Sequence, residues 1–208
     1  MILDLNDKSP NQIYHLMTQT LIPRPIAWVL SDSAVGQDSP NYNLAPFSYF
    51  TAVSSAPPLL MCSIGKKPNG DDKDTIVNAK NGSKLVIHIA SADQYREVTD
   101  SSATLAHGES ELENLGVSLA EFEGFDLPRL ETCPIAFGCE VYDIQTIGNT
   151  PQHLLFAEVK KIYIQDETLI ANDQRRITVD ATKVAPLSRL GAAQYADLGH
   201  VFSQARPK

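Results

Sequence analysis

The sequence predicts a mainly β protein, an antiparallel barrel or closed sheet decorated with short helices. About six or seven apolar runs have the length and composition of strands, and clusters of Gly, Pro, Asn and Asp separate them. Strand-like and helix-like segments do not alternate in the βαβ order that a doubly wound fold requires. The glycine motifs of dinucleotide-binding turns and P-loops, GxGxxG and GxxxxGK[ST], are also absent. These observations favour an all-antiparallel architecture.

Length and charge limit the class of protein further. The 208 residues, 43% of them hydrophobic, suit one globular domain spanning 1–208. A formal net charge of −8 without a long basic run argues against a nucleic-acid partner. The N-terminus lacks the pattern of a signal peptide, and no apolar run reaches the roughly 20 residues that span a bilayer. We therefore expect a cytoplasmic protein that does not enter membranes, with its three cysteines reduced and buried.

The first half of the chain predicts one helix followed by a series of strands. Ser9 and Pro10 suit the start of a short helix, which we expect to turn three side chains inward: Ile13, Leu16 and Met17. Residues 26–30 form an apolar strand, and 42–50 can return beside it as an antiparallel partner. Residues 53–58 are expected to turn the chain into a buried strand over 59–65.

The second half predicts further strands with helical insertions. A short helix over 75–80 precedes a strand over 84–90, in which His88 is more simply a buried histidine than a ligand. Ser91 caps a helix over 91–103, with Gln94 at the capping-box position.

After this helix, 104–130 is an irregular, acid-rich excursion with a short helix near 109–115, and its acids favour a solvated surface. Residues 134–147 and 153–165 form a long hairpin, 168–170 extends the sheet, and 188–198 forms the last helix.

The triplet Lys73-Asp74-Thr75 has a clear chemical use. A helix start presents unpaired backbone N–H groups and the positive end of a dipole, which suits a phosphate. Thr75 adds a hydroxyl donor, and Lys73 adds a positive charge. The alternative is that Asp74 or Thr75 simply caps an ordinary helix.

Side-chain catalysis has no recognisable motif in this chain. No HExxH zinc motif and no GxSxG nucleophile elbow occurs, and the five histidines are scattered. We expect no metal and no conventional catalytic residue, so a bound organic cofactor is the better source of chemistry.

Four motifs, in this order, resemble the flavin reductase-like family, the FMN-binding split-barrel proteins that include flavoredoxin-type members. They are PRPIAWV at 23–29, NLAPFSYFTAVSSAPPLLMCSIG at 43–65, KDT at 73–75 and PLSRLGAAQYADL at 186–198. The resemblance implies a six-stranded antiparallel split β-barrel with inserted short helices and a C-terminal helix. It also implies a homodimer that holds FMN non-covalently near the dimer interface. NADH or NADPH would then deliver electrons through the flavin to free flavin or another small acceptor.

The resemblance assigns the cofactor contacts to three parts of the chain. Lys73, Asp74 and Thr75 are expected to bind the phosphate of FMN, although the carboxylate of Asp74 would compete with it. The ring slot is expected to use backbone N–H groups and apolar walls from the first strands. Its residues are Pro25, Ile26, Ala27, Trp28, Asn43, Leu44, Ala45, Pro46, Ser48, Phe50, Ser63, Ile64 and Gly65. Taken singly, Trp28, Phe50 and Ile64 are more simply core residues.

Three further residues are candidates for substrate contact: His107, Arg189 and Tyr195. The family tail usually reads RLGG, whereas this chain has Ala192 at the last position. The alternatives are an FMN-binding electron-transfer protein of the same fold, a pyridoxamine-phosphate-oxidase-like or haem-binding barrel, and an interaction module without cofactor. Nicotinamide preference and the physiological acceptor stay open.

Overall fold

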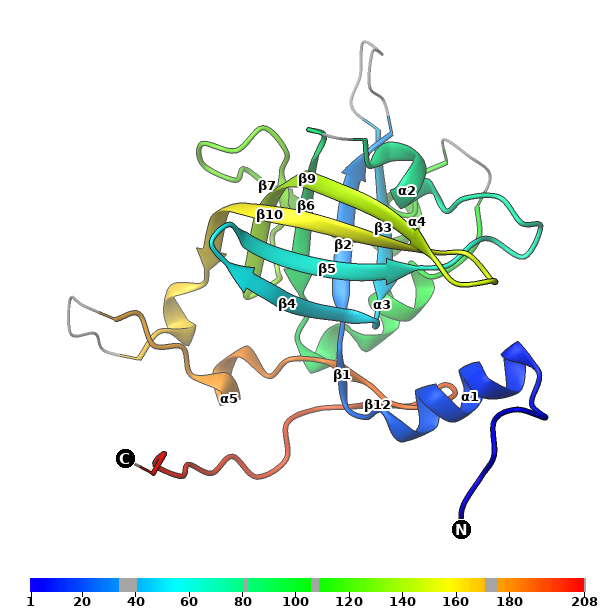
Figure 1. Ribbon diagram of the computed structural model, residues 1–208. Coiled ribbons are helices and arrows are strands. Elements are labelled where there is room, and N and C mark those ends of the chain that lie inside the picture. The colour runs from blue at the N-terminus through cyan, green and yellow to red at the C-terminus, as the bar shows by residue number, and fades with distance from the viewer. Residues whose placement is uncertain (34–40, 81, 106–108, 171–175, 208) are drawn as a thin grey trace.

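The protein is built on a seven-stranded antiparallel sheet, seen in a computed structural model (Figure 1). The structure describes residues 1–33, 41–80, 82–105, 109–170 and 176–207. The strand order is β3-β2-β6-β9-β10-β5-β4. Their bounds are β2 Ala27–Asp32, β3 Tyr42–Phe47, β4 Phe50–Ser55, β5 Pro58–Ile64, β6 Lys84–Ile89, β9 Ile135–Ile147 and β10 Gln152–Ile164. Every strand pair in this sheet is antiparallel, as the sequence predicts.

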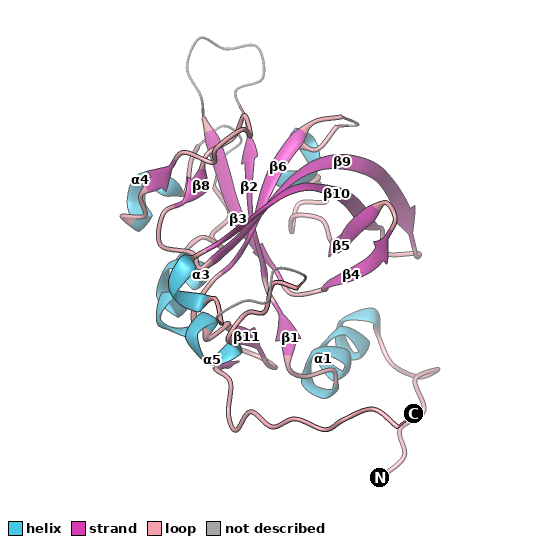
Figure 2. Cartoon of the chain, turned by 90° about the vertical axis from the view of Figure 1, so that its left-hand side faces the viewer, coloured by secondary structure: helices cyan, strands magenta, loops and turns pink. Residues whose placement is uncertain are grey.

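The two edge strands of this sheet are consecutive in the sequence. Only Ser48 and Tyr49 separate the end of β3 from the start of β4. Consecutive Cα atoms are about 3.8 Å apart, so this link spans at most about 11 Å. The sheet therefore has to curl until its edges approach, and Figure 2 shows the curl. Within the described residues no ladder joins β3 to β4, so the expected six-stranded barrel is not confirmed: the sheet has seven strands and stays open.

The curled sheet has a core on each face, and the period of two along a strand separates them. In β2, Ala27 and Val29 point into the inner core, while Trp28 and Leu30 point into the outer core. All four side chains are fully buried. A strand with both faces buried lacks alternation of apolar and polar residues, which explains the continuous apolar run IAWVL.

Short helices and small sheets cover the ends and the outer face. The helices are α1 Pro10–Thr20, α2 Asp74–Asn78, α3 Tyr95–Asp100, α4 Leu112–Leu115 and α5 Ala181–Val184, with 3-10 turns η1 Ala92–Gln94 and η2 Asp166–Thr168. The small strands are β1 Arg24–Pro25, β7 Leu119–Ala120, β8 Arg129–Leu130, β11 Ser188–Arg189 and β12 Tyr195–Ala196. β7 pairs with β8, and β1, β11 and β12 form a three-stranded sheet below the main one (Figure 1).

The N-terminal helix begins where the sequence predicts but packs differently. Ser9 and Gln12 form a complete capping box, and Pro10 occupies the first turn. Thr18 is the buried residue of α1, whereas the side chain of Met17 is 46% exposed. The inward orientation predicted for Met17 is therefore wrong.

The predicted C-terminal helix over 188–198 is also wrong. Ser188 and Arg189 pair with β1 instead, and a tight turn brings Tyr195 back onto Arg189. In that turn Ala192 has a φ of 50°, which a helix cannot accommodate. Pairing with β1 supplies backbone hydrogen bonds that outweigh the helix propensity of the Ala-rich sequence.

Two local predictions differ in smaller ways. Strand β4 continues through Val53 to Ser55, so the turn is confined to the residues before Pro58. Leu169 forms an isolated bridge to Val179 rather than extending the main sheet. The three cysteines are free and buried, as expected. No helix among the described residues is long and apolar enough to cross a membrane.

A buried arginine ties the lower end of the sheet to its neighbours. Arg24 is 4% exposed, and its Nη1 donates to the carbonyl oxygens of Thr18 and Leu21, both at 2.7 Å. Its Nη2 donates to the carbonyl of Leu190 at 2.8 Å, and its Nε donates to Ser48 Oγ at 3.4 Å. One side chain thus joins α1, the segment 186–198 that carries β11 and β12, and the link between the sheet edges.

We expect Arg24→Ala to lower the free energy of unfolding by about 2–4 kcal/mol, because it leaves several carbonyl groups without a donor. Urea denaturation would measure this change. Arg96→Ala is the control, since Arg96 is exposed, and its effect should stay within about 0.5 kcal/mol. Equal stabilities of the two variants would contradict the role assigned to Arg24.

Candidate functional site

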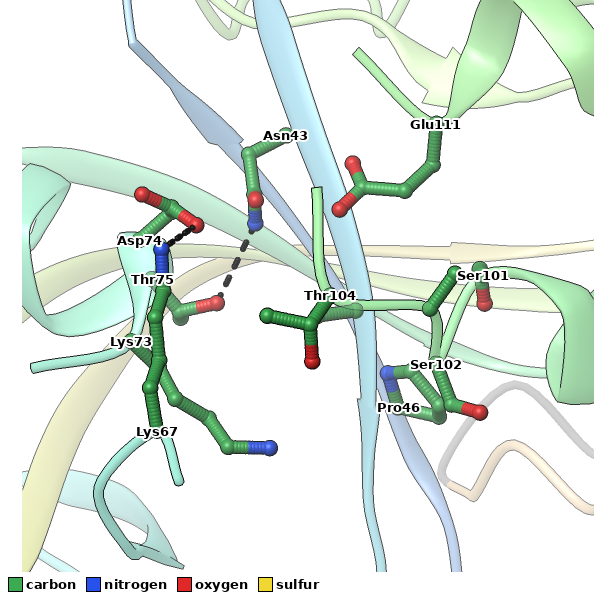
Figure 3. Close-up of a pocket in the computed structure, with 12 residues that line it drawn as sticks. Asn43, Pro46, Lys67, Lys73, Asp74, Thr75, Ser101, Ser102, Thr104 and Glu111 are labelled. Carbon is green, nitrogen blue, oxygen red and sulfur yellow. Dashed lines mark hydrogen bonds and ion pairs between the residues drawn. The ribbon is translucent and has the colours of Figure 1, made fainter. Parts of the chain in front are cut away.

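A polar pocket lies between β3, the start of α2 and the segments that follow α3 (Figure 3). Six of the predicted cofactor residues line it: Asn43, Ala45, Pro46, Lys73, Asp74 and Thr75. Six residues that were not predicted complete the lining: Lys67, Ser101, Ser102, Ala103, Thr104 and Glu111. The fold therefore brings the motifs at 43–46 and 73–75 together, as a shared site requires.

The start of α2 differs from the sequence prediction. Lys73 is the N-cap residue, and no side chain caps the helix. Asp74 instead forms an ion pair with Lys67, with 2.8 Å between Nζ and Oδ2, and both side chains are largely buried. The concern that Asp74 would compete for a phosphate is thereby answered, because Lys67 neutralises it. Helix α2 has only five residues, so the positive character of this site comes mainly from the lysines.

Thr75 presents a hydroxyl group at the wall of the pocket. The residue is 1% exposed, and its Oγ1 accepts a hydrogen bond from Asn43 Nδ2 at 3.2 Å. The hydroxyl proton has no acceptor among the hydrogen bonds of the described residues. A hydroxyl that already accepts from an amide is oriented to donate its proton to a ligand.

Lys73 extends its side chain into the same space (Figure 3). Its Nζ lies 5.6 Å from the ring centroid of Phe47, and no carboxylate partner of Lys73 occurs among the described residues. Burial lowers the pKa of the Lys73 ammonium group, and the nearby positive charge of Lys67 lowers it further. A half-buried ammonium group without a counter-ion is stabilised when an anion enters.

Glu111 is one of the pocket residues that sequence reasoning missed. The acids of the excursion were expected on a solvated surface, yet Glu111 is 7% exposed. Its Oε2 accepts a hydrogen bond from the backbone N–H of Leu44 at 2.9 Å. Leu44 lies 67 positions earlier in the chain, so no local pattern could indicate the contact.

Ser101, Ser102 and Thr104 line the side opposite α2. Trp28 Nε1 donates to Ser101 Oγ at 2.8 Å, and that hydroxyl group donates to the carbonyl of Val98 at 3.0 Å. Ser101 is therefore fixed by the fold, and Trp28 positions this wall from the outer core instead of facing the pocket.

Several predicted slot residues belong to the cores and do not line this pocket. The fully or almost fully buried ones are Ile26, Ala27, Trp28, Leu44 and Ile64. Phe50 packs against the inner core. The exposed Pro25 pairs with Ser188 in the small sheet.

Two backbone donors expected to face a flavin already have acceptors. The N–H of Leu44 donates to Glu111, and the N–H of Ser63 donates to the carbonyl of Tyr49 at 2.8 Å. Ser48 accepts from Arg24, and Gly65 lies against the side chain of Gln152. None of these four positions is among the residues that line the pocket.

Arg189 and Tyr195 interact with each other and with α3. The guanidinium carbon of Arg189 lies 4.4 Å from the centroid of the Tyr195 ring. The hydroxyl groups of Thr99 and Tyr195 are hydrogen-bonded, with 2.9 Å between Oγ1 and Oη, which places the segment 186–198 beside the helix that leads to Ser101 and Ser102. His107 lies outside the described residues.

His88 is a core residue with both ring nitrogens engaged, as the sequence favoured. It is fully buried, Nδ1 lies 3.0 Å from the carbonyl oxygen of Trp28, and Nε2 accepts from the N–H of Leu130 at 2.9 Å. These partners fix the neutral Nδ1–H tautomer. Neither nitrogen is available to ligate haem or a metal. No cluster that could hold a metal ion occurs in the part of the chain that the structure describes.

Fold and site together define a mainly β protein with a curled antiparallel sheet and a polar pocket lined by Lys73 and Thr75. A family model, the flavin reductase like domain, matches residues 18–179. The chain therefore belongs to the flavin reductase-like family, and the resemblance seen in the sequence is confirmed.

Relatives and solved structures agree with this assignment. The chain is 32% identical to the Bacillus subtilis protein YwrF, with 99% of this chain and 98% of that protein covered. A crystal structure of nitrilotriacetate monooxygenase component B from Bacillus cereus is 28% identical, with a TM-score of 0.85 and 98% of each chain covered. The 2-nitrobenzoate 2-nitroreductase NbaA of Pseudomonas fluorescens is 25% identical, with a TM-score of 0.84, 100% of this chain and 96% of that chain covered.

Burial of His88 predicts a pH dependence of stability, because it lowers the pKa of this imidazole to about 4. The unfolded chain binds a proton at His88 below about pH 6.5, whereas the folded chain does not until about pH 4. The contribution is therefore complete above pH 6.5 and is lost as the pH falls, by about 3 kcal/mol in total. Urea denaturation between pH 4 and 8 would measure this loss, and a His88→Gln variant should show a shallower slope. Identical slopes would contradict the assignment.

Proposed function

We propose that this protein is an FMN-binding oxidoreductase that passes electrons from NADH or NADPH through bound flavin to free flavin or another small acceptor. The single observation that carries the proposal is the pocket at Lys73 and Thr75, formed by the family motifs at 43–46 and 73–75. The protein would act as one domain over 1–208.

The residues present fit the phosphate of FMN. Lys73 offers a half-buried ammonium group without a carboxylate partner in the described part of the chain, and Thr75 offers a hydroxyl proton. Lys67 already neutralises Asp74, so that carboxylate does not oppose the ligand. Charge-assisted hydrogen bonds of this kind are the strong ones in phosphate recognition.

The chain's own groups would bind and orient the cofactor. Lys73 and Thr75 would hold the phosphate, Asn43 would keep the Thr75 hydroxyl oriented, and the wall at 101–104 would restrict the remaining space. Bound FMN would supply the redox chemistry, since electron transfer through a flavin requires positioning more than a side-chain acid or base. We therefore assign no catalytic residue. Arg189 and Tyr195, beside α3, and His107 are proposed to contact the nicotinamide or the acceptor.

A homodimer belongs to the same proposal. Strand β4 is an edge strand that is exposed over residues 51–55, and β5 is its ladder partner among the described residues. Exposed apolar side chains lie nearby in sequence and on α1, including Val53 at 46% and Tyr14 at 56%. Unpaired edges and apolar surfaces of this kind favour association between copies of a chain.

The similarity to a monooxygenase component and to a nitroreductase supports an oxidoreductase that serves a small-molecule acceptor. An FMN-binding electron-transfer protein with little direct NAD(P)H activity is the alternative on the same fold.

The deciding experiment is an anaerobic titration of the FMN-loaded protein with NADH and then NADPH. We expect loss of the visible flavin absorption with at least one nicotinamide, which also identifies the donor. Bound flavin that stays oxidised with both would support the electron-transfer alternative. Absence of any bound flavin would contradict the proposal as a whole.

The phosphate assignment has a separate test. We expect the double change Lys73→Ala, Thr75→Ala to weaken FMN binding about 10–100-fold, because it removes a charge-assisted contact and a neutral donor. Fluorescence titration would measure the dissociation constant. Riboflavin, which lacks the phosphate, should bind the double variant as it binds the parent protein. Lys160→Ala, at an exposed ion pair, is the control. Unchanged FMN affinity in the double variant would contradict the assignment.

A further inference from the structure

One carboxyl group of the pocket is not explained by a phosphate site. Glu111 faces the space between Asn43 and Thr104, as Figure 3 shows. A carboxylate so close to a bound phosphate repels it, unless the carboxyl group is protonated. The presence of Glu111 in the same pocket as Lys73 therefore requires an explanation of its own.

The charges that line the pocket cancel when every group is ionised. Lys67 and Lys73 supply two positive charges, and Asp74 and Glu111 supply two negative charges. A dianionic phosphate would enter a neutral site and leave it with two excess negative charges. Protonation of Glu111 changes the empty site to one net positive charge, which suits an anion.

The surroundings of Glu111 raise the pKa of its carboxyl group. Burial raises the pKa of this carboxyl group most, and the charge of Asp74 raises it further. The N–H groups of Leu44 and of Glu111 itself and the charge of Lys67 act in the opposite direction. A phosphate dianion in the pocket would add a second negative neighbour and raise the pKa again.

We propose that Glu111 is a ligand-binding residue of this pocket, which takes one proton from solvent when a phosphate-bearing ligand enters and then donates a hydrogen bond to it. This inference rests on the proposed function, in which the ligand is FMN. Oε2 keeps its hydrogen bond from Leu44 N–H, and the other carboxyl oxygen carries the proton. A protonated carboxyl group held in a poorly solvated site is a known type of donor to anionic groups.

The charged groups that line the pocket together with Glu111 come from one side of it. They are Lys67 and Lys73 from the segment before α2, and Asp74 from its first turn. Strand β3 and the 101–104 segment contribute uncharged residues to the described lining: Asn43, Ala45, Pro46, Ser101, Ser102, Ala103 and Thr104. The N–H of Leu44 donates to Glu111 Oε2. Glu109 lies on the same segment as Glu111 and is exposed. The proton balance of the pocket is thus expected to depend on Glu111.

Calorimetry on the intact protein tests this directly. FMN binding is measured at pH 7 in two buffers with different ionisation enthalpies, and the difference in heat gives the number of protons taken up. We expect the unmodified protein to take up more protons than Glu111→Gln, by a difference approaching one. Glu121→Gln, at an exposed acid of the same excursion, should behave like the unmodified protein.

The dissociation constant of FMN between pH 5.5 and 8.5 gives a second readout. At low pH the unmodified protein and Glu111→Gln should bind alike, since Gln imitates the neutral acid and still accepts from Leu44 N–H. At high pH Glu111→Gln should bind more tightly, by up to about tenfold for each pH unit above the pKa of Glu111. The phosphate itself titrates near pH 6, so the comparison between variants, not the absolute slope, is decisive.

Riboflavin separates the possible outcomes, because it lacks the phosphate. It should show little difference in proton uptake between the unmodified protein and Glu111→Gln. FMN affinities that change in parallel with pH in both proteins would overturn the role of Glu111 and leave the proposed function intact. Failure of both proteins to bind FMN at any pH would overturn both.

Discussion

The two-residue link between β3 and β4 is the constraint on which the rest of the structure depends. It joins the opposite edges of one sheet, so the sheet must curl, yet no ladder closes it among the described residues. Strand β3 is consequently an edge strand, and its outward backbone groups need other partners. Glu111 accepts from Leu44 N–H, and Ser110 Oγ donates to the carbonyl of Tyr42. The acid-rich excursion thus takes the place of a neighbouring strand, and the pocket forms where it meets α2.

The sequence predicts the strands well because their signals are local. Apolar runs bounded by turn residues locate β2, β5, β6, β9 and β10 within a few residues, and two buried faces account for their lack of alternation. The prediction of a C-terminal helix is wrong because a contact distant in the sequence determines the conformation there. Residues after Ser188 have helix-compatible composition, but pairing with β1, which lies more than 160 positions earlier, decides their conformation. Long-range pairing of that kind leaves no trace in a local pattern.

The site divides in the same way. Lys73, Thr75 and Asn43 were predicted to share a site from their motifs, and the structure places them in one pocket. Lys67 and Glu111 were not predicted, since each matters through a partner elsewhere: Asp74 for the lysine and Leu44 N–H for the glutamate. A binding role that depends on neighbouring residues in one local motif can be inferred from the sequence. The net charge of a pocket cannot, because it depends on which distant segments of the chain meet there.

The motif at 23–29 shows how fold and binding divide between neighbouring residues. Ala27 and Trp28 are fully buried on opposite faces of β2, so this motif mainly builds the two cores. Trp28 nevertheless affects the pocket, because its indole N–H donates a hydrogen bond to Ser101. Ser101 lines the pocket wall opposite Lys73. A substitution at Trp28 would therefore disturb the wall of the pocket through packing and through Ser101, although Trp28 is not among the residues that line it. The apolar residues of the motif thus position a polar residue of the pocket wall.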